Sequence, residues 1–152
     1  METISIKVKR LGNNPDLPMP GYETEGSSGM DIRAAVDGPV ILKPGEIRLI
    51  PTGFAVSIPP GYEGQVRPRS GLALRHGIGM VNSPGTIDSD YRGEVSIIMI
   101  NWGQTPFTIN RGDRIAQMVV GKVYRADLVD VDVEPLDSTQ RGTGGFGHSG
   151  VE

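Results

Sequence analysis

The sequence predicts one all-β domain, a sandwich or barrel built from many short strands. Its 152 residues include 22 glycines and 12 prolines but only six alanines, a composition that disfavours long helices. The apolar residues are mostly valine and isoleucine, and they come in short runs bounded by turn dipeptides such as Pro-Gly. A chain of this length forms a single domain with a core of its own.

The apolar runs in the first half of the chain predict a series of strands interrupted by one long loop. Residues 4–10 alternate between apolar and polar side chains, as a strand does, and the loop covers Gly12 to Ser28. In the run that follows, Asp31 and Arg33 fall on the face opposite Ile32. The other strands expected in this half are Met30–Val36, Val40–Leu42, Glu46–Ile50, Phe54–Ile58 and Tyr62–Arg67.

One short helix is expected in the middle of the chain. The segment Ser70–His76 has helix-compatible residues and is followed by Gly77, which suits a C-cap. Apolar, β-branched segments resume directly after it. The strands expected in this second half are Ile78–Val81, Glu94–Asn101, Phe107–Ile109, Arg114–Tyr124 and Leu128–Val133.

The last segment, Asp137 to Glu152, differs in composition from everything before it. Five of its sixteen residues are glycine, accompanied by serine, threonine and a single phenylalanine. Such a segment cannot bury a core, so we expect it to be mobile when nothing is bound. The sequence therefore divides into a β domain, residues 1–136, and a glycine-rich arm, residues 137–152.

Charge and composition limit the possible functions. The formal net charge of −3 and the isoelectric point near 5.4 disfavour nucleic-acid binding, whereas eleven arginines against four lysines favour phosphate contacts. No cysteine is present, and the two histidines, His76 and His148, lie too far apart in sequence to suggest a histidine metal cage. Because there is no signal-peptide pattern and no apolar run of roughly 18 residues, we expect a cytoplasmic protein without a membrane partner.

The most informative segment lies between two apolar runs, from Asn82 to Gly93. Its Pro-Gly and Asx residues predict a tight turn of a hairpin that carries two carboxylates, Asp88 and Asp90, and the ring of Tyr91. Backbone amides, an acid and an aromatic ring at one edge suit a polar ligand with a flat base. Alternatively, the two aspartates only make Asx hydrogen bonds within the turn.

Four further segments carry chemistry-bearing polar residues, and two of them have patterns that suit an anion. Ser70 and Gly71 open the expected helix, where amides and a hydroxyl can meet a phosphate, although Ser70 serves equally well as a plain N-cap. Glycine-rich backbone near the C-terminus can wrap a phosphate as well. The segments are Ser28–Ala35 (SGMDIRAA), Arg67–Ala73 (RPRSGLA), Gly112–Val119 (GDRIAQMV) and Arg141–Gly150 (RGTGGFGHSG).

Together with the central hairpin, these segments resemble, in order and spacing, the five motifs of the trimeric dUTP pyrophosphatases (dUTPases). The resemblance covers most of the chain between Ser28 and Gly150. It implies a distorted jelly-roll β-barrel that assembles as a homotrimer, with each active site shared between subunits. It also implies Mg²⁺-dependent hydrolysis of dUTP to dUMP and pyrophosphate, which limits uracil in DNA and supplies the precursor of dTMP.

The resemblance also implies a role for individual residues. Asp88 would hold the attacking water, and Asp31 would reach Mg²⁺ only through water, because the substrate phosphates bind the ion. Asp31 could instead be an ordinary strand charge in an ion pair. His148 and Ser149 would lie near the substrate. The implied substrate-binding residues are Arg69, Ser70, Gly71, Asn82, Thr86, Ile87, Tyr91, Ser96, Gln117, Arg141, Phe146 and Gly147.

Two other functions remain open from the sequence. A dCTP deaminase shares the implied fold and trimer, but it needs a catalytic glutamate where this hairpin offers Asp88 and Tyr91. A non-catalytic β-module that binds nucleotide is the second alternative. Ammonia release from dCTP would identify the first, and absence of any turnover the second.

Overall fold

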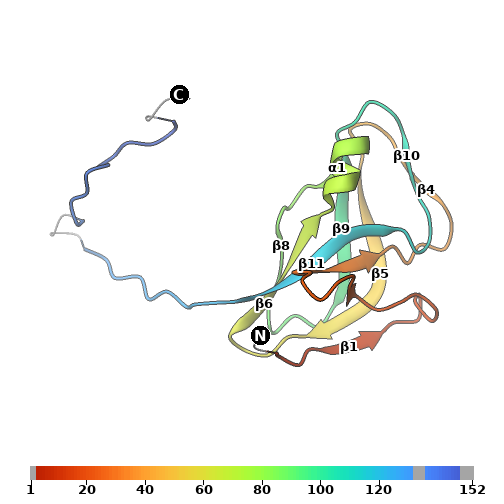
Figure 1. Ribbon diagram of the computed structural model, residues 1–152, viewed down its shortest axis with the longest axis horizontal. Coiled ribbons are helices and arrows are strands. Elements are labelled where there is room, and N and C mark those ends of the chain that lie inside the picture. The colour runs from red at the N-terminus through yellow and green to blue at the C-terminus, as the bar shows by residue number, and fades with distance from the viewer. Residues whose placement is uncertain (1–2, 132–135, 148–152) are drawn as a thin grey trace.

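The computed structural model describes residues 3–131 and 136–147, and within them the chain forms eleven strands and one helix (Figure 1). The all-β prediction is confirmed. The elements are β1 Lys7–Arg10, β2 Gly21–Tyr22, β3 Gly29–Arg33, β4 Val40–Leu42, β5 Ile47–Ser57, β6 Tyr62–Pro68, α1 Ser70–His76, β7 Ile78–Met80, β8 Gly85–Ile87, β9 Glu94–Asn101, β10 Phe107–Ile109 and β11 Arg114–Lys122.

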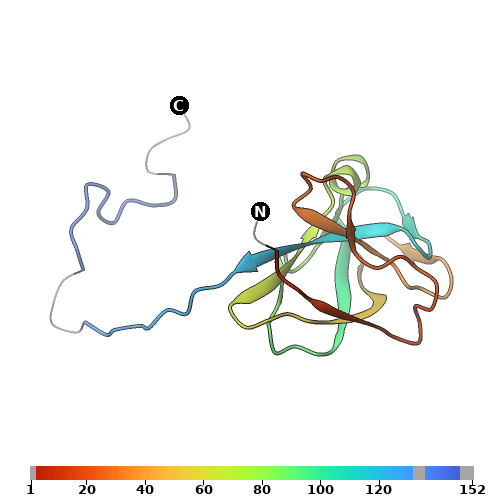
Figure 2. The same cartoon turned by 60° about the horizontal axis from the view of Figure 1, so that its bottom comes forward.

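The described strands form two larger sheets and one small one. The first has the order β1-β5-β9-β7, the second β2-β3-β11-β6-β8, and β10 pairs with β4. All the pairings are antiparallel, as in a jelly-roll-like fold, and the sheets do not close into one continuous barrel. Figure 2 shows the sheets gathered into one body, from which the chain leaves after β11 as an extended segment.

The core lies between the sheets because their strands alternate apolar and outward-facing residues. In β9, Val95, Ile97 and Met99 are at most 3% exposed, while the residues between them face outward. The same cluster takes Phe54 from β5 and Ile32 from β3. As predicted, Asp31 and Arg33 lie on the face opposite Ile32.

The helix begins and ends as predicted. Gly77 adopts a left-handed conformation with φ 65°, and its amide donates to carbonyls of the last turn. The N-cap position is occupied by Arg69, without a side-chain capping bond. The alternative of an N-cap at Ser70 is therefore wrong, since Ser70 is the first helical residue.

Several predicted strand limits are wrong because pairing between distant segments decides them. Residues 47–57 form one strand where two, Glu46–Ile50 and Phe54–Ile58, are expected; the irregular register between Pro51 and Ala55 absorbs the residues expected to separate them. The expected loop before β3 contains the short strand β2. Residues 128–131 of the strand expected at Leu128–Val133 are not in a strand, and its remaining residues lie outside the described ranges.

The central hairpin is also more extended than predicted. Its flanking strands β7 and β9 pair as expected, but their connection is no tight turn. Within it, Gly85–Ile87 forms β8 and pairs with β6 of the other sheet. The connection therefore crosses from one sheet to the other and leaves a space between them.

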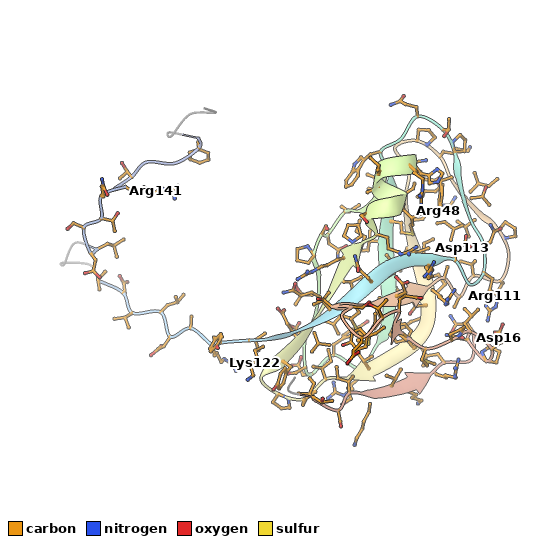
Figure 3. The ribbon with its side chains drawn as sticks, viewed as in Figure 1. Asp16, Arg48, Arg111, Asp113, Lys122 and Arg141 are labelled. Carbon is orange, nitrogen blue, oxygen red and sulfur yellow. The ribbon has the colours of Figure 1, made fainter. Side chains whose placement is uncertain are left out.

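An ion pair holds the N-terminal loop against the turn before β11. Arg111 donates to Asp16 and to the backbone carbonyl of Asn13, and the two charged side chains lie side by side in Figure 3. The hydrogen bond from Arg111 lowers the pKa of the Asp16 carboxyl below its usual range. The pair thus fixes the loop that leads toward β2 and β3.

Candidate active site

A cavity of about 290 Å³ opens where the connection between β7 and β9 crosses between the sheets. We call it the hairpin cavity. Apolar side chains such as Leu49, Val66 and Ile98 form much of its wall. Five of the substrate-binding residues that the resemblance implies also line it, namely Asn82, Thr86, Ile87, Tyr91 and Ser96. An apolar slot with polar groups at its edge suits a flat heterocycle.

The ring of Tyr91 is held at the edge of this cavity by its own turn. Its hydroxyl donates to the carbonyl of Glu94 at 2.9 Å, and the residue remains 45% exposed. A Cβ at Gly93 would overlap the hydroxyl oxygen, so only glycine leaves room for the ring. The Glu94 carboxylate in turn accepts hydrogen bonds from the Gly53 amide and the Asn13 side chain. Sequence reasoning missed this supporting role of Glu94.

Asp88 follows β8 directly and is exposed beside the hairpin cavity. Its backbone carbonyl accepts a hydrogen bond from the Tyr91 amide at 3.1 Å, which closes the turn. Among the described residues, the carboxylates of Asp88 and Asp90 accept no hydrogen bond. The Asx alternative therefore finds no support, and both carboxylates are available to bind water.

The polar residues of the second sheet form a charged network around Asp31. One carboxylate oxygen of Asp31 pairs with Arg69 Nε at 3.1 Å, and the other pairs with Arg114 Nη1 at 3.0 Å. Arg114 also pairs with Glu23, and its backbone carbonyl accepts a bond from Arg69. The ion-pair interpretation of Asp31 is thus confirmed, and Arg114 is a member of the network that the sequence did not single out.

A second cavity, also about 290 Å³, lies on the outer face of this sheet beside Asp31. We call it the sheet cavity. Gln117 lines it and donates from its amide nitrogen to the carbonyl of Pro68 at 3.1 Å. Gly29 lies beneath the Gln117 side chain, since a Cβ there would be 2.5 Å from Oε1. Ser70 and Gly71 begin α1 immediately after Arg69.

The arm contributes no residue to either cavity. Residues 136–147 lie well away from the β body, and Figure 3 shows Arg141 far from it. Arg141 donates to the carbonyl of Gly144, whereas Phe146 is fully exposed, and Gly147 follows it. His148 and Ser149 lie outside the described residues. Within one chain, the site candidates therefore form three separate groups: the hairpin cavity with Asp88, the sheet cavity with Asp31, and the arm.

The described residues contain no group of three or more histidine, cysteine, aspartate or glutamate side chains that could hold a metal ion. Both oxygens of Asp31 are engaged by arginines, yet each carboxylate oxygen can accept more than one hydrogen bond. This donor set fits a Mg²⁺ ion that is bound by phosphates and contacted through water, and does not fit a protein cage.

In the described residues, no helix is long and apolar enough to span a membrane.

Comparison with known proteins gives a consistent result. The dUTPase family matches residues 16–150. A deoxyuridine 5'-triphosphate nucleotidohydrolase of Anaeromyxobacter is 62% identical over 97% of this chain and 98% of its own. The dUTPase of Staphylococcus bacteriophage 80alpha, solved with dUPNHPP, is 30% identical with a TM-score of 0.86 over 98% and 100% of the two chains. A mutant dUTPase of phage phi11 of S. aureus, described with a structural Mg(II) ion, has a TM-score of 0.74 at 28% identity over 85% and 97% of the two chains.

Proposed function

The chain belongs to the dUTPase family and hydrolyses dUTP to dUMP and pyrophosphate, and we propose that it does so at sites assembled from several copies of the chain. The relatives described above are dUTP nucleotidohydrolases and dUTPases, which favours this activity over a dCTP deaminase or a non-catalytic module. The observation that carries the proposal is the separation of the site candidates. The hairpin cavity and the sheet cavity share no lining residue, and the arm contacts neither.

An exposed apolar stripe supports association of the chains. On β5, Ile47 and Leu49 are 52% and 65% exposed, and they pair with Ile100 and Ile98 on β9. Contiguous exposed apolar surface of this kind marks a protein interface. Leu49 and Ile98 also line the hairpin cavity, so a partner packed on the stripe would reach the edge of that cavity. We assign this stripe to the homotrimer interface.

In the proposed site, each group has a distinct task. The hairpin cavity of one copy binds uracil, with Tyr91 beneath the deoxyribose. The network around Asp31 in another copy, with Ser70, Gly71 and Gln117, receives the triphosphate. The arm of a third copy closes over both and brings Arg141 to the phosphates and Phe146 onto the base. The nucleotide substrate of this site also supports the cytoplasmic location expected from the sequence.

The chemical step rests on Asp88. Its exposed carboxylate holds a water molecule, accepts a proton from it and directs the oxygen to the α-phosphorus, where the bond to the pyrophosphate oxygen breaks. Magnesium bound to the phosphates would neutralise charge on the leaving pyrophosphate. Arg69, fixed by Asp31, supplies oriented N–H donors, and Arg141 adds positive charge from the protein. Tyr91 excludes a 2′-hydroxyl by its position.

A subunit-mixing experiment tests the shared site. One variant ends after Thr139 and lacks most of the arm; the other carries Asp88→Asn. Each is expected to be nearly inactive alone. When random trimers form from equal amounts, about one quarter of the sites combine an intact arm with an intact Asp88 from different copies, and activity should recover to that extent. If subunit exchange is verified by mass spectrometry and the mixture stays as inactive as its parents, the shared-site proposal is wrong.

A further inference from the structure

We propose that Arg67 is an additional binding residue for the polyphosphate chain of the substrate, an inference that rests on the proposed function. Arg67 lies on β6 and lines the sheet cavity with Asp31 and Gln117. The strand registers place these three residues in one row, since Gln117 on β11 pairs with Asp31 on one side and with Arg67 on the other. Their side chains therefore leave the same face of the sheet.

The charge balance of the sheet cavity singles out this residue. Arg69 and Arg114 are neutralised by ion pairs with Asp31 and Glu23. Arg67 is exposed, and among the described residues its guanidinium has no carboxylate partner. Counted together with these two arginines, which lie beside the cavity, its charged residues leave one positive charge uncompensated, that of Arg67, in a protein whose net charge is −3.

One hydrogen bond orients the Arg67 guanidinium and leaves most of its donors free for a ligand. The guanidinium donates to the side-chain oxygen of Gln65 at 2.7 Å, and Gln65 donates to Glu63 at 2.7 Å, so the three side chains form a ladder along β6. A neutral amide orients Arg67 while leaving most of its five N–H groups available. An oriented arginine with unused donors suits phosphate oxygens, which accept two parallel hydrogen bonds.

Because Arg67 would contact phosphate oxygens and not the water held by Asp88, it should bind substrate and transition state alike. Arg67→Gln is expected to raise KM for dUTP about tenfold and leave kcat nearly unchanged. Arg67→Lys keeps the charge but loses the planar fork, so its KM should rise less than that of Arg67→Gln. The KM of Arg67→Gln should also depend less on salt than that of the unmodified protein. Lys9→Gln, on β1 of the other sheet, removes the same charge as a matched control.

The experiment combines steady-state hydrolysis of dUTP with calorimetric binding of inorganic tripolyphosphate and of deoxyuridine. Weaker binding of tripolyphosphate by Arg67→Gln, with binding of deoxyuridine unchanged, supports the inference. If the unmodified protein hydrolyses dUTP but Arg67→Gln matches Lys9→Gln in KM and salt dependence, the inference is wrong and the function stands. A fall in kcat together with a lower unfolding temperature would show a structural role and also overturn it. Arg67-dependent binding of tripolyphosphate without any dUTP hydrolysis would instead refute the function alone.

Discussion

Adding one methyl group at Gly29 should misplace Gln117 while leaving the β domain folded. A Cβ at this position would lie 2.5 Å from Oε1 of Gln117 and 3.3 Å from its Cδ. Because these atoms end a flexible side chain, the amide can swing away, and its 3.1 Å bond to the Pro68 carbonyl is then lost. Losing that bond costs about 1 kcal/mol, and replacing a strand glycine by alanine returns roughly 0.5–1 kcal/mol. The unfolding temperature should therefore change by only a few degrees.

The effect on activity should be much larger. If Gln117 donates to a phosphate oxygen, its hydrogen bond to a charged group contributes about 1.5–3 kcal/mol. Gly29→Ala should then lower kcat/KM for dUTP by roughly 10- to 100-fold, measured as pyrophosphate release. Gly121→Ala is the matched control. Gly121 lies on the same face of β11 as Gln117, and a Cβ at Gly121 would meet Glu63 at an ordinary 3.7 Å.

A double-mutant cycle shows whether Gly29 acts through Gln117. Because Gln117→Ala removes the side chain that the new methyl group displaces, the double variant should lose no more activity than Gln117→Ala alone. If the two losses multiply in the double variant, the methyl group acts by another route. Equal kcat/KM for Gly29→Ala and Gly121→Ala would refute the claim that a methyl group at Gly29 misplaces Gln117.

The remaining predictions concern the catalytic acid, the sugar and the N-terminal loop. Asp88→Asn should lower kcat by roughly 10²–10⁴ with little change in KM, whereas Asp90→Asn should retain activity in the same pyrophosphate assay; the reverse pattern would exchange their roles. Tyr91→Ala should raise kcat/KM for UTP relative to dUTP, and an unchanged ratio would refute its role in excluding the 2′-hydroxyl. Because the Arg111 hydrogen bond lowers the pKa of Asp16, the ion pair should stabilise the fold above about pH 4. The difference in unfolding free energy between the unmodified protein and Asp16→Asn should therefore shrink as the pH falls below this value, and a difference that grows there would contradict the assignment.

The elements predicted correctly are those whose signals are local. The limits of α1 follow from Gly77, which must adopt the left-handed conformation at the C-cap. The limits of β9 follow from its strict alternation, which matches a half-buried strand. The expected break between Ile50 and Phe54 is wrong because the Gly53 amide donates to Glu94 and its carbonyl accepts from Leu11, contacts that no local pattern reveals. Strands as short as β8 exist only because a partner strand is present.

The residues of the candidate site show the same difference between local signals and contacts between distant segments. The hairpin residues lie close together in sequence, so their common cavity could be anticipated from the turn that carries them. The pairing of Asp31 with Arg69 and Arg114 depends on the order of β3, β11 and β6 in the sheet, which the sequence does not reveal. Leu128 is 91% exposed in a segment that finds no strand partner among the described residues of its own chain. Its apolar pattern predicted a strand, but residues 128–131 do not form one.

Three arginines in and beside the sheet cavity explain how an acidic protein can bind a polyanion. Ion pairs with Asp31 and Glu23 fix the geometry of Arg69 and Arg114. The same carboxylates neutralise the positive charges of these two arginines. Arg67 is held only by a neutral amide and keeps its charge. Fixed donors favour the transition state, whereas net charge favours encounter with the substrate from solution. Substitutions in the ion-paired network should therefore act on kcat, and substitution of Arg67 should act on KM and its dependence on salt.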